Sequence, residues 1–159
     1  MIPARRFGHV VLAVRDMKKS SEFYAMAVGL KVAAYNEARG QCFMSFGDDH
    51  HTLGLFRRAA PDGVPPAPDQ PGIVHIAFEM EDFPAVQAAH AELVGKGVEI
   101  ERVVEHNVTR SIYFRDPDNN CVELFSNLHE NGFEGMRSTR LYNAPLDIET
   151  GKTGEIEYF

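Results

Sequence analysis

Two histidines, His9 and His75, hold matching places in two similar segments of the chain. Each stands near the start of an expected strand, and an aspartate follows seven residues later, at Asp16 and Asp82. Such self-similarity indicates an internal repeat. If the two repeats pair about a pseudo-two-fold axis, both imidazoles approach that axis. Two converging imidazoles are typical of transition-metal sites.

A third candidate, Glu123, lies within the strand-like segment Asn120–Phe125. The two-residue period of a strand places it on one face with Cys121. An unpaired carboxylate there is costly, so we expect Glu123 to be paired or to bind a metal. The other interpretation is an edge strand with Glu123 in solvent. Together with the two histidines it makes a set that suits Fe(II) with open coordination positions.

The elements around these residues repeat as strand, helix and three strands. Each predicted helix follows an aspartate that can cap its N-terminus and ends at a glycine. These helices cover residues 17–28, before Gly29, and residues 83–94, before Gly95. The later strands are expected at 31–35, 41–46 and 52–56 in the first repeat, and at 98–103, 110–114 and 121–125 in the second.

The segments outside the repeats differ in composition. Residues 59–72 contain five prolines, which prevent regular structure and make a semi-rigid connector. We expect one domain, residues 1–127, with modules 6–57 and 73–127 joined by this linker. The C-terminal extension, residues 128–159, has no sustained period, so it packs on the body or on a partner chain, or is partly disordered.

Composition limits the class of protein. The chain has 159 residues, 44% of them hydrophobic, and a net charge of −7. That excludes global disorder, and the acidic balance argues against a nucleic-acid partner. No apolar run is long enough for a membrane span. Two cysteines make no disulfide framework, so we expect a reducing, cytoplasmic location.

A longer motif surrounds Glu123. His106 is followed by Tyr113 after an apolar residue, then by Asp116 and Pro117, and then by Glu123. This motif, with the repeats, resembles the vicinal oxygen chelate superfamily over residues 6 to 127. That superfamily includes glyoxalase I, bleomycin-resistance proteins and extradiol ring-cleavage dioxygenases, and the motif is most similar to that of the extradiol enzymes. Asn119 stands where the family usually has Gly or Pro, and Asn tolerates the left-handed conformation.

The resemblance implies an α+β fold in which two βαβββ modules form a curved mixed sheet around a metal site. The family's metal ligands fall on His9, His75 and Glu123. The implied metal is Fe(II), which Mn(II) can replace because both favour similar ligands. The implied partners are a catechol-like substrate and O2, without nucleic acid or membrane. We also expect a homo-oligomer, a dimer or higher. The sequence leaves open whether the modules pair within one chain or across two.

The resemblance also assigns catalytic roles. The family's acid/base histidine falls on His51, at the expected start of the fourth strand, and the neighbouring His50 should face away by strand alternation. The signature residues His106 and Tyr113 should form hydrogen bonds to the substrate. The alternative for these two is a structural role, Tyr113 as a core aromatic and His106 as a solvated loop residue.

Gly54 helps to distinguish ring cleavage from a glyoxalase-type activity. When Leu55 and Phe56 are aligned with Leu124 and Phe125, Gly54 falls opposite Glu123. Glyoxalase-type members usually have a fourth ligand there, which glycine cannot supply. Three protein ligands leave room for a bidentate catecholate and O2, so ring cleavage is favoured. The alternatives are a metal-dependent glyoxalase-like lyase or isomerase, and a metal-free small-molecule binder of the bleomycin-resistance type, which needs no such ligand set.

Overall fold

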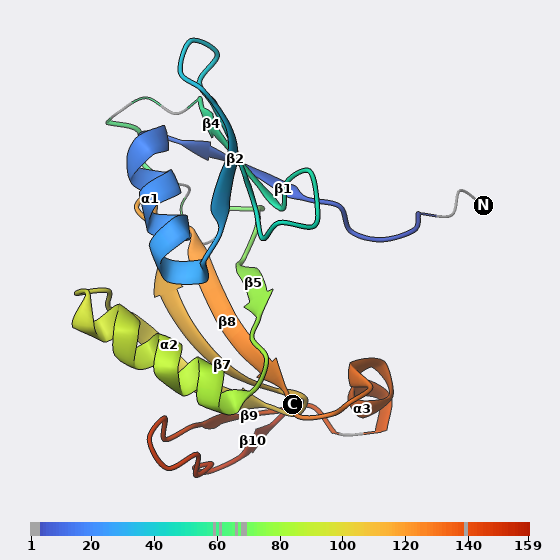
Figure 1. Ribbon diagram of the computed structural model, residues 1–159. Coiled ribbons are helices and arrows are strands. Elements are labelled where there is room, and N and C mark those ends of the chain that lie inside the picture. Colours follow the sequence, from blue (N-terminus) through green and yellow to red (C-terminus); the bar gives the residue numbers. More distant parts are fainter. Residues whose placement is uncertain (1–3, 59, 61, 66, 68–69, 139) are drawn as a thin grey trace. The chain divides into compact units, whose positions relative to one another are not determined.

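The computed structural model describes residues 4–58, 60, 62–65, 67, 70–138 and 140–159. The chain divides into two compact units (Figure 1). The first comprises residues 1–70 with 116–118, and the second comprises residues 71–115 with 119–159. Within the described ranges, no helix is long and apolar enough to cross a membrane.

The first unit is a βαβββ module. Its elements in chain order are β1 (Val10–Val14), α1 (Met17–Val28), β2 (Lys31–Asn36), β3 (Gln41–Ser45) and β4 (Leu53–Arg57). The sheet has the order β1-β4-β3-β2, with β1 parallel to β4 and the other pairs antiparallel.

The ends of α1 follow the sequence prediction. The side chain of Asp16 accepts a hydrogen bond from the Lys19 amide at 3.0 Å. Gly29 ends the helix with a φ of 75°, a left-handed conformation that glycine adopts without a Cβ penalty. The helix buries Met17 and Tyr24 completely or nearly so, which gives the module its core with the strands.

The second unit repeats this module and adds elements from the C-terminal extension. It contains β5 (Ile76–Glu79), α2 (Phe83–Gly95), β6 (Ile100–His106), β7 (Thr109–Arg115), β8 (Cys121–Asn127), α3 (Gly132–Ser138), β9 (Tyr142–Pro145) and β10 (Glu157–Tyr158). The sheet order is β10-β9-β6-β7-β8-β5, with β5 parallel to β8. Helix α2 packs against β8 and β7 (Figure 1).

The α+β class with two βαβββ modules is therefore confirmed. That the sheets together surround a metal stays a prediction, as does the division into one domain with an extension. The predicted connector, residues 59–72, includes residues 59, 61, 66, 68 and 69, which lie outside the described residues. The sequence left open whether the extension packs on the body, packs on a partner chain or is partly disordered. In the structure it packs on the body, because β9 pairs with β6 and β10 pairs with β9.

The turn before β8 also follows the sequence prediction. Asn119 has a φ of 69° and is the one non-glycine residue of the described part with a positive φ. Asn tolerates this conformation because its short polar side chain can form local hydrogen bonds.

Candidate active site

The second unit places Tyr113 and Glu123 directly opposite each other on the antiparallel pair β7–β8. Their neighbours Ile112, Phe114 and Leu124 are completely buried, whereas these two polar residues alternate with them and so occupy the other face of the sheet. The exposed fractions are 3% for Tyr113 and 6% for Glu123. The Tyr113 hydroxyl donates a hydrogen bond to Glu123 Oε1 at 2.7 Å.

His75 meets the other oxygen of the same carboxylate. It lies one residue before β5, and β5 pairs with β8 so that Ala77 is opposite Glu123. The Nε2 atom of His75 lies 3.1 Å from Glu123 Oε2. The sheet register therefore brings an imidazole and a buried carboxylate together, and each carboxylate oxygen has one partner.

His106 extends this chain of contacts from the end of β6. Its Nε2 lies 2.9 Å from the Tyr113 hydroxyl, and its Nδ1 lies 2.5 Å from Oδ1 of Asn143 in β9. The single phenol proton goes to Glu123, so Nε2 supplies the proton of its contact with Tyr113. In a neutral imidazole Nδ1 is then the acceptor, and it pairs with the Asn143 carboxamide when the amide presents its NH2 group, which fixes the orientation of the ring.

The surroundings keep Tyr113 protonated. Burial raises its pKa above the ordinary value of a phenol, and the hydrogen bond and charge of Glu123 raise it further. The guanidinium of Arg102, 4.1 Å from the centre of the Tyr113 ring, opposes this shift only in part. Tyr113 thus remains a hydrogen-bond donor across the physiological pH range.

A cavity of about 720 Å³ opens beside His106. Its walls come from β6, from β9 and from the segment that leads into β10, and include Arg102, Val104, His106, Asn143, Pro145 and Ile156. The extension therefore supplies part of the wall next to a predicted catalytic residue.

The first unit gathers three histidines. His9 lies one residue before β1, and His50 and His51 precede β4. The ring centroids are 4.1 Å apart for His9 and His51, 4.3 Å for His50 and His51, and 5.7 Å for His9 and His50. Partial burial, followed by the charges of His9 and His50, lowers the pKa of His51 below its ordinary value.

The prediction that His50 faces away from His51 is wrong. It required both residues to lie in the fourth strand, where side chains alternate. β4 begins only at Leu53, and the residues before it form an irregular turn. Alternation does not apply in that turn, so both rings approach His9.

Gly54 occupies the place in the first module that Glu123 occupies in the second. Gly54 is opposite Val11 in the β1–β4 pair, and Glu123 is opposite Ala77 in the β5–β8 pair. Val11 and Ala77 each stand two residues after the matching histidines. A Cβ at Gly54 would lie 3.0 Å from Cγ2 of Val11, so that neighbour crowds the position.

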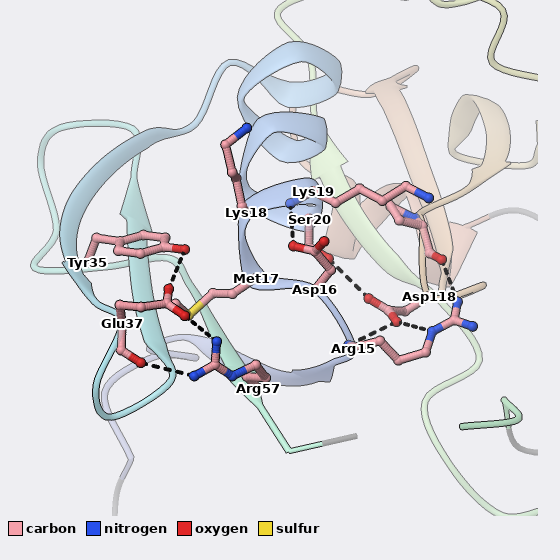
Figure 2. Close-up of a pocket in the computed structure, with 11 residues that line it drawn as sticks. Arg15, Asp16, Met17, Lys18, Lys19, Ser20, Tyr35, Glu37, Arg57 and Asp118 are labelled. Carbon is pink, nitrogen blue, oxygen red and sulfur yellow. Dashed lines mark hydrogen bonds and ion pairs between the residues drawn. The ribbon is translucent and has the colours of Figure 1, made fainter. Parts of the chain in front are cut away.

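The Asp-Pro pair of the signature has a structural place in the first unit. The Tyr24 hydroxyl donates to Asp116 at 2.9 Å, and Arg15 Nε donates to Asp118 at 2.7 Å. A hollow of about 620 Å³ lies around the start of α1. In it, Arg15 pairs with Asp118 and Arg57 pairs with Glu37 (Figure 2). These charges are paired with one another, and the hollow is also lined by Lys18, which pairs with Glu22, and by Lys19.

Each predicted site residue thus has a defined local setting. The second unit brings together His75, Glu123, Tyr113 and His106, and the first unit brings together His9 and His51. That His9 joins His75 and Glu123 at one metal stays a prediction.

The sequence analysis did not identify Asn143 and Arg102 as site residues. The segment around Asn143 lacks a periodic pattern, and the β6–β7 register that brings Arg102 to Tyr113 contains an irregularity between Ile100 and Arg102.

Comparison with known proteins agrees with this architecture. Residues 6–124 match the family model described as "Glyoxalase/Bleomycin resistance protein/Dioxygenase superfamily". The chain is similar to biphenyl-2,3-diol 1,2-dioxygenase 3 of Rhodococcus globerulus, with 34% identity over 121 residues, 75% of this chain and 62% of that protein. It is also similar to biphenyl-2,3-diol 1,2-dioxygenase 2 of the same organism, with 31% identity over 125 residues, 78% of this chain and 64% of that protein.

The chain spans less than two thirds of the length of these two relatives. Among solved structures, the fosfomycin resistance protein FosX of Listeria monocytogenes has a similar fold, with a TM-score of 0.64 and 20% identity. That comparison covers 86% of this chain and 100% of that one. With two βαβββ modules and a family match over most of its length, the chain belongs to the glyoxalase/bleomycin resistance/dioxygenase superfamily.

Proposed function

We propose that this chain is an extradiol dioxygenase that cleaves a catechol-type ring with O2 at a non-haem Fe(II) site. The observation that carries the proposal is the chain of side-chain contacts from His75 through Glu123 and Tyr113 to His106. Two relatives named for a diol with adjacent hydroxyls support this substrate class.

The donor set fits Fe(II). His9, His75 and Glu123 would hold the metal as two imidazoles and one carboxylate, the set found in many non-haem iron oxygenases. His75 Nε2 and Glu123 Oε2 lie 3.1 Å apart, so these two donor atoms are close enough to belong to one metal site. Fe(II) would supply open positions at which a diol and O2 meet, and Mn(II) would fit the same donors.

The residues around Glu123 support this role. Tyr113 donates to Oε1, which leaves Oε2 as the oxygen that faces His75 and would face a metal. The Tyr113 proton is engaged by Glu123, so Tyr113 would offer the substrate an oxygen lone pair, whereas His106 would turn its Nε2 proton from Tyr113 to a substrate oxygen.

His51 is the candidate acid/base. Its lowered pKa favours the neutral imidazole near pH 7, and a neutral imidazole can take a proton from a catechol hydroxyl and later return it. Phe43, with its ring centroid 5.0 Å from that of His51, packs beside the imidazole. His51 would act near the substrate and not as a ligand of the iron.

The same proposal includes a homo-oligomer in the cytoplasm with a small-molecule substrate and O2. Both cysteines, Cys42 and Cys121, are free and buried, which supports a reducing location.

The test is an aerobic assay with a panel of catechols after anaerobic loading of the full chain with Fe(II). We expect a yellow ring-opened product with matching O2 uptake, and loss of both in Glu123→Ala. Turnover of a thiol adduct with Zn(II) or Ni(II), without O2 uptake, would instead indicate a glyoxalase-like lyase or isomerase. Tight binding of small molecules without metal or turnover would indicate a binder of the bleomycin-resistance type.

A further inference from the structure

We propose that His9, His50 and His51 form a second metal site, which shares only His9 with the proposed iron ligands and binds Zn2+ or a similar borderline divalent cation. The three side chains offer ligating nitrogens that all lie within 4.8 Å of one another. All three residues belong to the first unit, so the site needs no ligand from His75 or Glu123.

The turn that presents two of these histidines is held by hydrogen bonds. The buried Ser45 donates from its hydroxyl to the Asp49 carbonyl at 2.7 Å and accepts from the Gly47 amide at 2.9 Å. The Thr52 amide donates to the Met44 carbonyl at 2.8 Å. The segment from Gly47 to Thr52 is therefore fixed at both ends, which limits the conformational entropy that a bound ion must remove.

The donors are three imidazoles without a carboxylate. The side chain of Asp49, the neighbour of His50, pairs with Arg6, so its charge is already engaged. The site would therefore supply three imidazole ligands and leave the fourth position to water, as in several catalytic zinc sites.

The cluster is close to a binding geometry. Nitrogens bound to a tetrahedral zinc at about 2.0–2.1 Å lie about 3.4 Å apart. His9 and His50 are exposed, so rotation of their side chains can close the remaining distance without moving the core. His51 is less exposed and packs beside Phe43, which makes it the more fixed member of the set.

The donor types also favour particular metals. Imidazole suits Zn, Cu, Fe and Ni, and the affinity of a nitrogen site for divalent metals is low for Fe2+ and rises toward Cu2+. Fe2+ would instead gain from the carboxylate of Glu123. We therefore expect the three-histidine site to select Zn2+ over Fe2+.

One consequence rests on the proposed function. His9 belongs both to the three-histidine site and to the proposed iron ligands. Zn2+ held by His50 and His51 would withdraw His9 from the iron, so Zn2+ would inhibit ring cleavage.

The test uses the metal-free full chain with both proposed second-unit ligands replaced, His75→Gln with Glu123→Gln. Calorimetric titration with Zn2+ should give one site per chain, and histidine-selective NMR should show the imidazoles of His9, His50 and His51 shifting together. Adding His50→Gln should weaken Zn2+ binding by about 100-fold or more, because even loss of a partner behind a ligand costs about 10–100-fold. Adding His90→Gln, on α2, is the matched control and should leave the affinity unchanged.

Several results would overturn the site. They are absence of Zn2+ binding in the double variant, equal affinity after His50→Gln, and shifts confined to other histidines. Circular dichroism of each variant separates lost ligands from lost folding. Zn2+ binding in the double variant without ring cleavage by the wild type would reject the proposed function and keep the site. Ring cleavage without Zn2+ binding would reject the site and keep the function.

Discussion

The hydroxyl of Tyr113 donates a 2.7 Å hydrogen bond to Oε1 of Glu123, and the two residues face each other across the β7–β8 pair. Both residues are buried, so the hydrogen bond between them replaces those that each would otherwise form with water. The same phenol oxygen contacts His106, so one atom joins the predicted metal ligand to a predicted catalytic residue.

Replacing Tyr113 by Phe should weaken Fe(II) binding by about 10–100-fold, because partners behind a metal ligand typically contribute that much. The variant removes only the oxygen, so Glu123 loses its buried donor while the ring keeps its packing. Anaerobic titration with Fe(II) measures the change. Tyr142→Phe is the matched control, since Tyr142 donates to Glu105 instead, and equal losses in both variants would contradict the assignment.

Replacing Asn143 by Ala should lower kcat/KM for catechol by about 10-fold, a modest share of what acid–base groups contribute. The amide orients His106 through Nδ1, so its loss should also shift the pH dependence of kcat/KM, which a purely structural role would not do. Steady-state assays from pH 5 to 9 measure both. Asn131→Ala, which alters the cap of α3 in the same extension, should leave the pH profile unchanged.

Replacing His51 by Gln should lower kcat by about 10²–10⁴-fold, the usual contribution of a general acid or base. Iron content should stay the same, because His51 is not among the proposed iron ligands. Single-turnover assays and iron analysis on the same sample separate these effects. A variant with normal kcat, or one that fails to retain iron, would reject the acid/base role, and His90→Gln serves as the neutral control.

Sequence patterns located the elements of both modules because their determinants are local. Asp16 and Asp82 cap the helices, and alternating apolar residues mark the strands. The relation of Gly54 to Glu123 followed from aligning two similar strands. The orientation of His50 could not be predicted, because it depends on a turn held by the buried Ser45.

The extension shows a second limit of sequence reasoning. β9 and β10 have four and two residues, too few to display an apolar period. They form because β6 offers an open edge and because Glu105 anchors the segment through Tyr142 and Thr153. The contact of Asn143 with His106 depends on that pairing, so it became visible only in three dimensions.

Glu105 should make the protein sensitive to acid. Burial would raise the pKa of this carboxyl, but hydrogen bonds from Arg110, Tyr142 and Thr153 outweigh burial and hold the pKa below its ordinary value. A lowered folded-state pKa stabilises the protein above the unfolded-state value, and that stabilisation is lost as the pH falls through the folded-state pKa.

Glu105→Gln should therefore reduce the free energy of unfolding at pH 7 by about 1–3 kcal/mol, the cost of weakening hydrogen bonds to a buried charge. The difference from wild type should shrink as the pH falls below the ordinary pKa of glutamate. Urea unfolding at several pH values measures both. Glu134→Gln, at an exposed ion pair, should leave the curve unchanged, and a pH-independent difference would contradict the role of Glu105.

In the proposed iron site, Gly54 would keep the number of protein ligands at three. Gly54→Ala alone should destabilise the first unit by about 1–3 kcal/mol, since its Cβ would meet Cγ2 of Val11 at 3.0 Å. Val11→Ala in the same chain should recover most of that loss.

In a chain that carries Val11→Ala, glutamate at position 54 would stand where Glu123 stands in the other module and would offer a fourth ligand. We expect that double variant, Val11→Ala with Gly54→Glu, to bind metal at least as tightly as the Val11→Ala control and to lose ring cleavage, because the added carboxylate occupies a position that the diol or O2 needs. Metal titration and O2 uptake measure the two effects. Undiminished cleavage with a tightly held metal would show that the glycine is not what keeps the coordination sphere open.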